Sequence, residues 1–193
     1  TLTTTASTCV MKRYSTINVS NISLAFIPTN VSCNGANNGA INLVPSGGFA
    51  PYTYTWTGPS SFSSNSQNIS GLAPGNYSVI VKGLKGCTTS GTVSISQPSV
   101  LTATLSSPTY NGGFNIACNG GNSGSAISNV SGGVSPYTFT WSSTPTQTTA
   151  NASNLTAGNY TLTIKDANNC LLTKTISLTQ PAPLNAAIGS QQN

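Results

Sequence analysis

An internal repeat constrains the fold of this chain more than any other feature. The tripeptide Cys-Asn-Gly at 33–35 recurs 85 residues later at 118–120. At the same offset, Pro-Tyr-Thr-Tyr-Thr-Trp at 51–56 recurs as Pro-Tyr-Thr-Phe-Thr-Trp at 136–141. A period above 80 residues is too long for a solenoid unit and suits a small independent domain. The sequence therefore predicts domains in tandem.

The repeat frame also predicts the domain boundaries. Each full copy closes on Gln-Pro, so we expect one repeat over 21–98 and a second over 99–181. Residues 1–20 resemble the C-terminal strands of a preceding repeat, and residues 182–193 resemble the start of a following one. The chain is predicted to be a window on a longer array.

Alternating side chains within each repeat predict β-strands. Tyr52, Tyr54 and Trp56 share one face at period two. Tyr77, Val79 and Val81 alternate with Ser78, Ile80 and Lys82, which predicts a strand that is apolar on both faces until its end. No helical period with caps is present, and Gly, Pro and Asn punctuate the strands. The predicted fold is all-β, as tandem antiparallel β-sandwiches of the Ig-like or fibronectin-III-like kind.

Aromatic residues recur at matching positions in the two copies. The stretch Leu-x-x-Gly-Asn-Tyr that ends at Tyr77 and Tyr160 resembles a tyrosine corner, in which the hydroxyl bonds to nearby backbone. Trp56 and Trp141 are expected in the core, with sugar stacking as the alternative. Phe62, in the loop after Trp56, is the better candidate for contact with a ligand, although the second copy has no aromatic there.

The cysteines also follow the repeat. Matching positions in the two copies predict the pairs Cys33–Cys87 and Cys118–Cys170, one disulfide per repeat. Cys9 is expected to pair with a residue that precedes Thr1, with a free buried thiol as the alternative. Disulfides of this kind indicate a location outside the cytoplasm.

The composition argues against catalysis and metal binding. The chain has no His, six scattered cations and a single carboxylate, Asp166. General acid–base catalysis and the usual zinc and calcium sites need groups that are missing here, so we expect no enzyme, no metal site and no cofactor. Nucleic-acid binders gather their cations on one face, so we expect no nucleic-acid partner. No run of apolar residues is long enough to span a membrane.

The combined motifs resemble the SprB repeats of gliding-motility adhesins from Bacteroidetes. The pattern is Cys-Asn-Gly, Gly-Gly-x-x-Pro-Tyr-Thr-Tyr/Phe-Thr-Trp, Leu-x-x-Gly-Asn-Tyr, a second Cys and Gln-Pro. The first copy departs from it at 82–87, where Asp166 of the second copy has no acidic counterpart. The resemblance implies very large, type IX-secreted cell-surface proteins, some moved by the gliding machinery and some attached to surfaces or polysaccharide.

Two functions fit these expectations. The first is a structural or adhesive segment of an extracellular, cell-surface adhesin, whose repeats form a stalk or filament and contact neighbouring repeats. The alternative is a set of carbohydrate-binding modules that contact polysaccharide directly. Low charge and open sheet edges also allow homotypic contacts between fibres.

Overall fold

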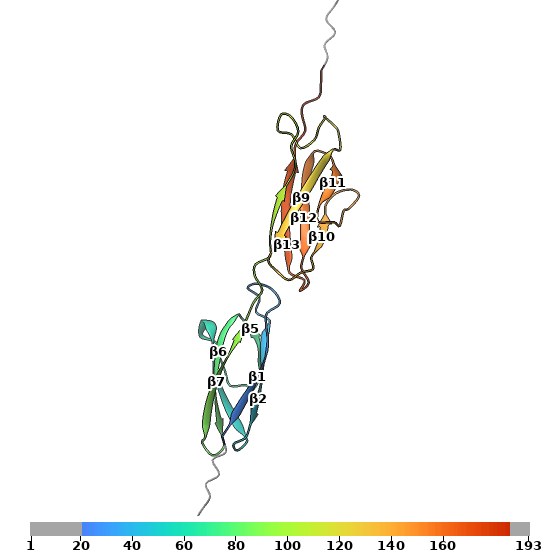
Figure 1. The fold of residues 1–193 in the computed structure, drawn as a ribbon. Coiled ribbons are helices and arrows are strands. Elements are labelled where there is room, and N and C mark those ends of the chain that lie inside the picture. Colours follow the sequence, from blue (N-terminus) through green and yellow to red (C-terminus); the bar gives the residue numbers. More distant parts are fainter. Residues whose placement is uncertain (1–20, 186–193) are drawn as a thin grey trace, which may run out of the picture.

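The computed structural model of the chain describes residues 21–185 (Figure 1). The expectations for 1–20, for 186–193 and for Cys9 lie outside the described residues. Within the described range the only helical element is a single 3-10 turn, Pro59–Ser61, and every other element is a β-strand. The expected all-β class is confirmed.

The first repeat forms two facing antiparallel sheets. One has the order β1-β2-β5 and the other the order β4-β3-β6-β7. This is the arrangement of an Ig-like sandwich, with the tryptophan strand and the tyrosine-corner strand adjacent in one sheet. The strands are β1 (Ser23–Thr29), β2 (Gly39–Ser46), β3 (Tyr52–Thr57), β4 (Ser63–Ser64), β5 (Ile69–Leu72), β6 (Gly75–Gly83) and β7 (Thr88–Ile95).

The second repeat has the same architecture without the short fourth strand. Its sheets have the orders β11-β9-β8 and β10-β12-β13. The strands are β8 (Thr102–Ser106), β9 (Gly124–Ser131), β10 (Thr138–Trp141), β11 (Ala152–Leu155), β12 (Gly158–Lys165) and β13 (Leu171–Leu178). The missing strand corresponds to the shortened loop after Trp141.

Each sandwich has its own hydrophobic core. The buried residues of the first core come from the sequence range 22–95, and those of the second core come from the range 103–178. Trp56 and Trp141 are 0% and 1% exposed, respectively. Along β6 every second residue is buried, because successive side chains of a strand point to opposite faces. The domain boundaries at 98 and 181 stay predictions. The first core comes from residues before 98 and the second core from residues after it.

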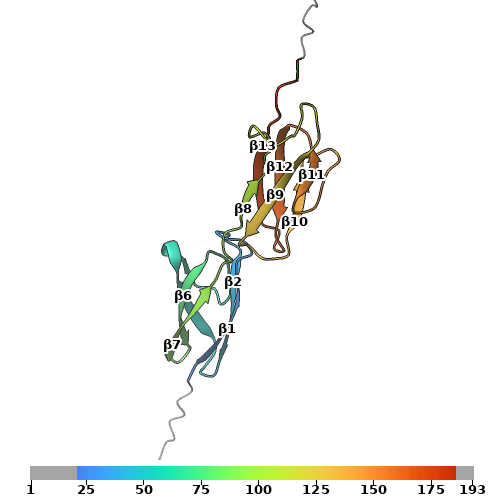
Figure 2. The same cartoon turned by 45° about the horizontal axis from the view of Figure 1, so that its top comes forward.

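The two sandwiches lie end to end along one axis (Figures 1 and 2). The antiparallel register places the starts of β2 and β6 and the end of β7 at the end of the first sandwich that faces the second. The β2–β3 and β6–β7 turns lie at the opposite end. Each repeat therefore has two distinct ends, and their loops decide how repeats connect.

Candidate functional site at the junction between the repeats

The linker between the sandwiches is held by the Cys-Asn-Gly loop of the first repeat. The Asn34 side-chain amide donates to the carbonyl oxygen of Pro98 at 3.0 Å. The backbone N–H of Gly35 donates to Gln97 Oε1 at 2.8 Å. Two motifs that recur far apart in the sequence, Cys-Asn-Gly and Gln-Pro, are thus two halves of one contact.

The Gly-Gly turn of the second repeat holds the other side of the linker. The N–H of Gly133 donates to the carbonyl oxygen of Ser99 at 2.9 Å. Gly132 has a positive φ of 74°, and a Cβ there would overlap the carbonyl oxygen of Val100. The Tyr137 hydroxyl donates to the Gly132 carbonyl oxygen at 2.6 Å and fixes the turn.

A disulfide crosses the junction. Cys33 of the first repeat is bonded to Cys170 of the second, 137 residues away, with a Cα–Cα distance of 5.7 Å. Beside it, the Asn168 side-chain amide donates to the carbonyl oxygen of Ser32 at 2.9 Å. The expected pairs Cys33–Cys87 and Cys118–Cys170, with one disulfide inside each repeat, are therefore wrong.

Strand geometry explains this correction. Cys33 lies at the junction end of the first sandwich, since the neighbouring Gly35 is bonded to Gln97. Cys87 lies in the β6–β7 turn at the opposite end. The eight residues of β7 separate these ends by roughly 25 Å at about 3.3 Å per residue. Cysteines can be bridged only when their Cα atoms lie within about 7 Å.

Asp166 shapes the turn that carries Cys170. Its carboxylate is buried, at 3% exposure, and accepts the backbone N–H groups of Val134, Asn168 and Cys170 at 3.0, 2.9 and 2.8 Å. In the first repeat Gly83 takes this place, and a Cβ there would lie 2.9 Å from the carbonyl oxygen of Phe49. The first copy therefore has no side chain at this position, and the backbone of Phe49 lies where a side chain would begin.

The remaining cysteines of the described chain, Cys87 and Cys118, are unbonded and exposed. Cys87 is the counterpart of Cys170, and Cys118 is the counterpart of Cys33. They lie at the two outer ends of the pair of sandwiches, away from the junction.

The tyrosines of the Gly-Asn-Tyr motifs bond back to the backbone. The Tyr77 hydroxyl donates to the carbonyl oxygen of Ala73 at 2.9 Å, and that of Tyr160 to Thr156 at 3.0 Å. These contacts have the geometry of a tyrosine corner. Burial raises the pKa of Tyr77 and also that of Tyr54.

Phe62 lies against the first core. Its ring meets the Tyr77 ring edge to face, with centroids 5.3 Å apart, and its side chain is half-buried. The indole N–H of Trp56 donates to Ser66 O at 2.9 Å, and that of Trp141 to Thr149 O at 3.1 Å. The two Trp side chains are thus buried in the cores, and Phe62 packs partly against Tyr77.

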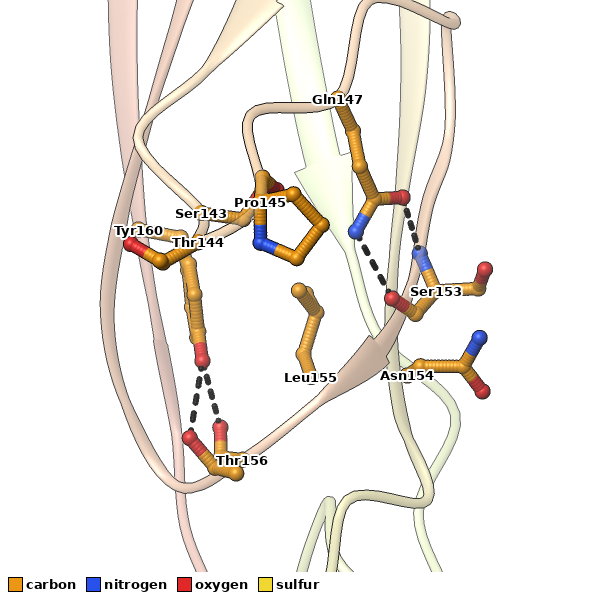
Figure 3. Close-up of a pocket in the computed structure, with 9 residues that line it drawn as sticks. All are labelled: Ser143, Thr144, Pro145, Gln147, Ser153, Asn154, Leu155, Thr156 and Tyr160. Atoms are coloured by element: carbon orange, nitrogen blue, oxygen red, sulfur yellow. Dashed lines mark hydrogen bonds between the residues drawn. The ribbon is translucent and has the colours of Figure 1, made fainter.

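The second repeat has a small pocket lined by Tyr160, the counterpart of the Tyr77 that Phe62 packs against in the first repeat. Its volume is about 250 Å³, and Figure 3 shows the residues around it. Gln147 bonds to the backbone of Ser153 at both amide atoms, and the Tyr160 hydroxyl bonds to Thr156. Ser143 Oγ donates to Pro145 O at 2.8 Å. The polar groups that would orient a ligand are thus largely paired within the protein.

Both repeats of the chain contain a segment that matches a known family. The SprB repeat family model matches residues 25–61 and 115–146. Both segments match the SprB repeat. Each SprB match contains the first cysteine of its copy, and neither reaches the second cysteine or the Gln-Pro junction. No curated protein sequence matches the chain.

Solved structures give only distant likenesses to this chain. The N-terminal eight Ig domains of Down Syndrome Cell Adhesion Molecule share 14% identity at a TM-score of 0.33, over 80% of this chain and 23% of that one. The amphioxus IgVJ-C2 molecule shares 15% identity at a TM-score of 0.31, over 83% of this chain and 97% of that one. The fold assignment therefore rests on the strands and sheets themselves.

Two further observations concern residues 21–185. No helix there has the length and hydropathy needed to cross a bilayer. No group of three His, Cys, Asp or Glu side chains gathers there at metal-binding distance.

Proposed function

We propose that this chain is a structural segment of a large repetitive cell-surface adhesin, in which the repeats form a stalk or filament. The junction carries this proposal. A short linker is hydrogen-bonded to both sandwiches, and a covalent bridge joins Cys33 to Cys170 across it. A joint held at three points limits the motion of one repeat against the next. Limited motion suits a spacer more than a flexible tether.

The same proposal places the segment outside the cell. Disulfides persist in oxidising compartments, so Cys33–Cys170 supports an extracellular location. The SprB matches support export by the type IX system of Bacteroidetes, with the gliding or secretion machinery and surface polysaccharide as partners of the whole adhesin. In this segment the partners are the neighbouring repeats.

Small-angle scattering on the oxidised full chain tests the stalk. We expect an elongated particle whose largest dimension stays constant between low and high salt, because the joint holds through covalent and short polar contacts. A set of compact and extended conformers would contradict the proposal.

Binding to a polysaccharide panel tests the alternative, that the repeats are carbohydrate-binding modules. The half-buried Phe62 and the internally bonded pocket of the second repeat weigh against it. We expect no saturable binding. Saturable binding that is lost on Phe62→Ala and kept on the matched exposed variant Phe49→Ala would favour the carbohydrate-binding function.

A further inference from the structure

We infer that the Cys33–Cys170 bridge is one link of a repeating series, in which every repeat is bonded to both neighbours. In this series Cys118 bonds to the second cysteine of the following repeat, and Cys87 bonds to the first cysteine of the preceding one. The inference rests on the proposed array. It does not rest on adhesion, because disulfide connectivity is measured independently of binding.

The loop that carries Cys118 already has the shape of the bonded loop. Asn119 Nδ2 donates to Pro181 O at 2.9 Å, and the Gly120 N–H donates to Gln180 Oε1 at 2.8 Å. These bonds match those of Asn34 and Gly35 within about 0.1 Å. The end of the second repeat thus presents its cysteine as the first repeat does at the formed junction.

The turn that carries Cys87 likewise matches the turn that carries Cys170. The N–H of Gly83 donates to Cys87 O at 2.9 Å, and that of Asp166 donates to Cys170 O at 3.0 Å. Leu84 N–H bonds to Phe49 O at 2.8 Å, and Ala167 N–H bonds to Val134 O at 2.8 Å. The same backbone frame therefore holds both second-position cysteines.

Two exposed apolar residues lie at the same end of the first repeat as the unbonded Cys87. Phe49 and Leu84 are 46% and 65% exposed, and they are linked by the Leu84–Phe49 backbone hydrogen bond. Their counterparts in the second repeat are Val134 and Ala167. The residues next to these two, Gly133 and Asn168, bond to Ser99 and Ser32 at the formed junction. Exposed apolar side chains at the same end as an unbonded thiol fit a surface that another repeat contacts.

Cys87 and Cys118 of one chain are too far apart to form a disulfide with each other. They lie at opposite outer ends of two stacked sandwiches, each roughly 25 Å long by its strand rise. In the proposed array their partners therefore come from other repeats. Each bridge crosses one junction, and successive bridges overlap in sequence. The series therefore crosslinks every junction between neighbouring repeats.

Peptide mapping of the full chain tests the link that the structure contains. Trypsin cuts after Lys82, Lys85, Lys165 and Lys174, so Cys33 and Cys170 fall on separate peptides, while Cys87 and Cys118 share residues 86–165. In the monomeric fraction, with thiols blocked before digestion, we expect 14–82 joined to 166–174, and 86–165 alkylated at both cysteines. A join from 86–165 to either peptide would overturn the inference.

A three-repeat chain tests the propagation. Residues 1–181 are followed by a second copy of 99–193, which reproduces the Gln-Pro-Ser-Val linker at the new junction. The exposed Thr173→Ser change in the added copy marks its cysteine peptide by mass. We expect Cys118 to lose its reactivity with alkylating agents and to bond to the marked peptide, and Cys170→Ser in the added copy to restore that reactivity.

A Cys118 that stays alkylated in the three-repeat chain, or that bonds within its own repeat, would overturn the inference. If the three-repeat chain does not fold, a mixture of Cys87→Ser and Cys118→Ser chains, both with Cys9→Ser, provides a second test. We expect an oxidised dimer joined from Cys118 of one chain to Cys87 of the other, and no dimer from either variant alone. Dimers from one variant alone would contradict the specific pairing.

Discussion

At the scale of residues, the buried Asp166 carboxylate accepts three backbone N–H groups in the turn before Cys170. A side chain that accepts three backbone bonds in this way stabilises the local shape of the chain. Tyr77 has a similar role, because its hydroxyl ties the start of β6 to Ala73. Both side chains lend themselves to single-residue tests.

Asp166→Asn is expected to lower the free energy of unfolding of the second repeat by about 1–3 kcal/mol. The amide keeps one acceptor oxygen, but its NH₂ group would face the N–H of Val134, which then lacks a partner. Urea unfolding of the oxidised chain measures the change. The neighbouring exposed variant Lys165→Gln is the control, and an equal shift in both variants would contradict this role.

Tyr77→Phe is expected to lower the free energy of unfolding by about 0.5–1.5 kcal/mol at pH 8, through loss of the bond to Ala73. Burial raises the Tyr77 pKa above the unfolded value of about 10. The folded state therefore keeps its proton longer, and the stabilising effect is complete below pH 10 and lost as the pH rises through the folded pKa. The difference between wild type and Tyr77→Phe should shrink above pH 10 in denaturant titrations. A stability difference that stays constant above pH 10 would contradict this role of the Tyr77 hydroxyl.

At the scale of elements, loops decide what each sandwich can contact. The Cys-Asn-Gly loop and the Gln-Pro linker meet at one end, and the Gly-Gly and β6–β7 turns lie at the other. The Gly35 bond to Gln97 has an equivalent in the Gly120 bond to Gln180. The chain thus contains its own matched control for this contact.

Gln97→Ala is expected to speed amide hydrogen exchange at Gly35 by roughly 2- to 10-fold, because the N–H loses its acceptor. Exchange at Gly120 should stay unchanged in this variant. Gln180→Ala should have the reverse effect, and both rates are read from one exchange experiment. Equal acceleration at both glycines would mean that the contact is not local.

At the scale of the whole molecule, the Cys33–Cys170 bridge encloses most of both sandwiches in one covalent loop. Tension along the chain passes through the bridge and bypasses the residues between its ends. Unfolding of residues 33–170 therefore cannot lengthen the molecule, and only the segments outside the loop, which contain β1 and β13, can be extended. A stalk built in this way keeps its length under load.

Single-molecule pulling on the full chain measures this effect. Reduction should release roughly 450–490 Å of additional extended chain, given the 137-residue separation and about 3.3–3.6 Å per residue. Cys33→Ser should show the same long extension without reductant, and Cys87→Ser should behave as the oxidised wild type. An extension that does not depend on reductant would contradict the enclosing bridge.

The sequence by itself determined the all-β sandwich, because period-two alternation leaves only one face of each strand to bury. Trp56 and Val79 follow from that rule, and the repeat offsets follow from direct comparison of residues. Only the tertiary structure decided which cysteines meet. The spacing of the cysteines in the sequence is the same whether each cysteine pairs within its own repeat or with the neighbouring repeat. The two pairings are distinguished only by the fold, which places Cys33 and Cys87 at opposite ends of the first sandwich. The position of Phe62 was decided in the same way, because the packing of a loop depends on contacts that no periodicity encodes.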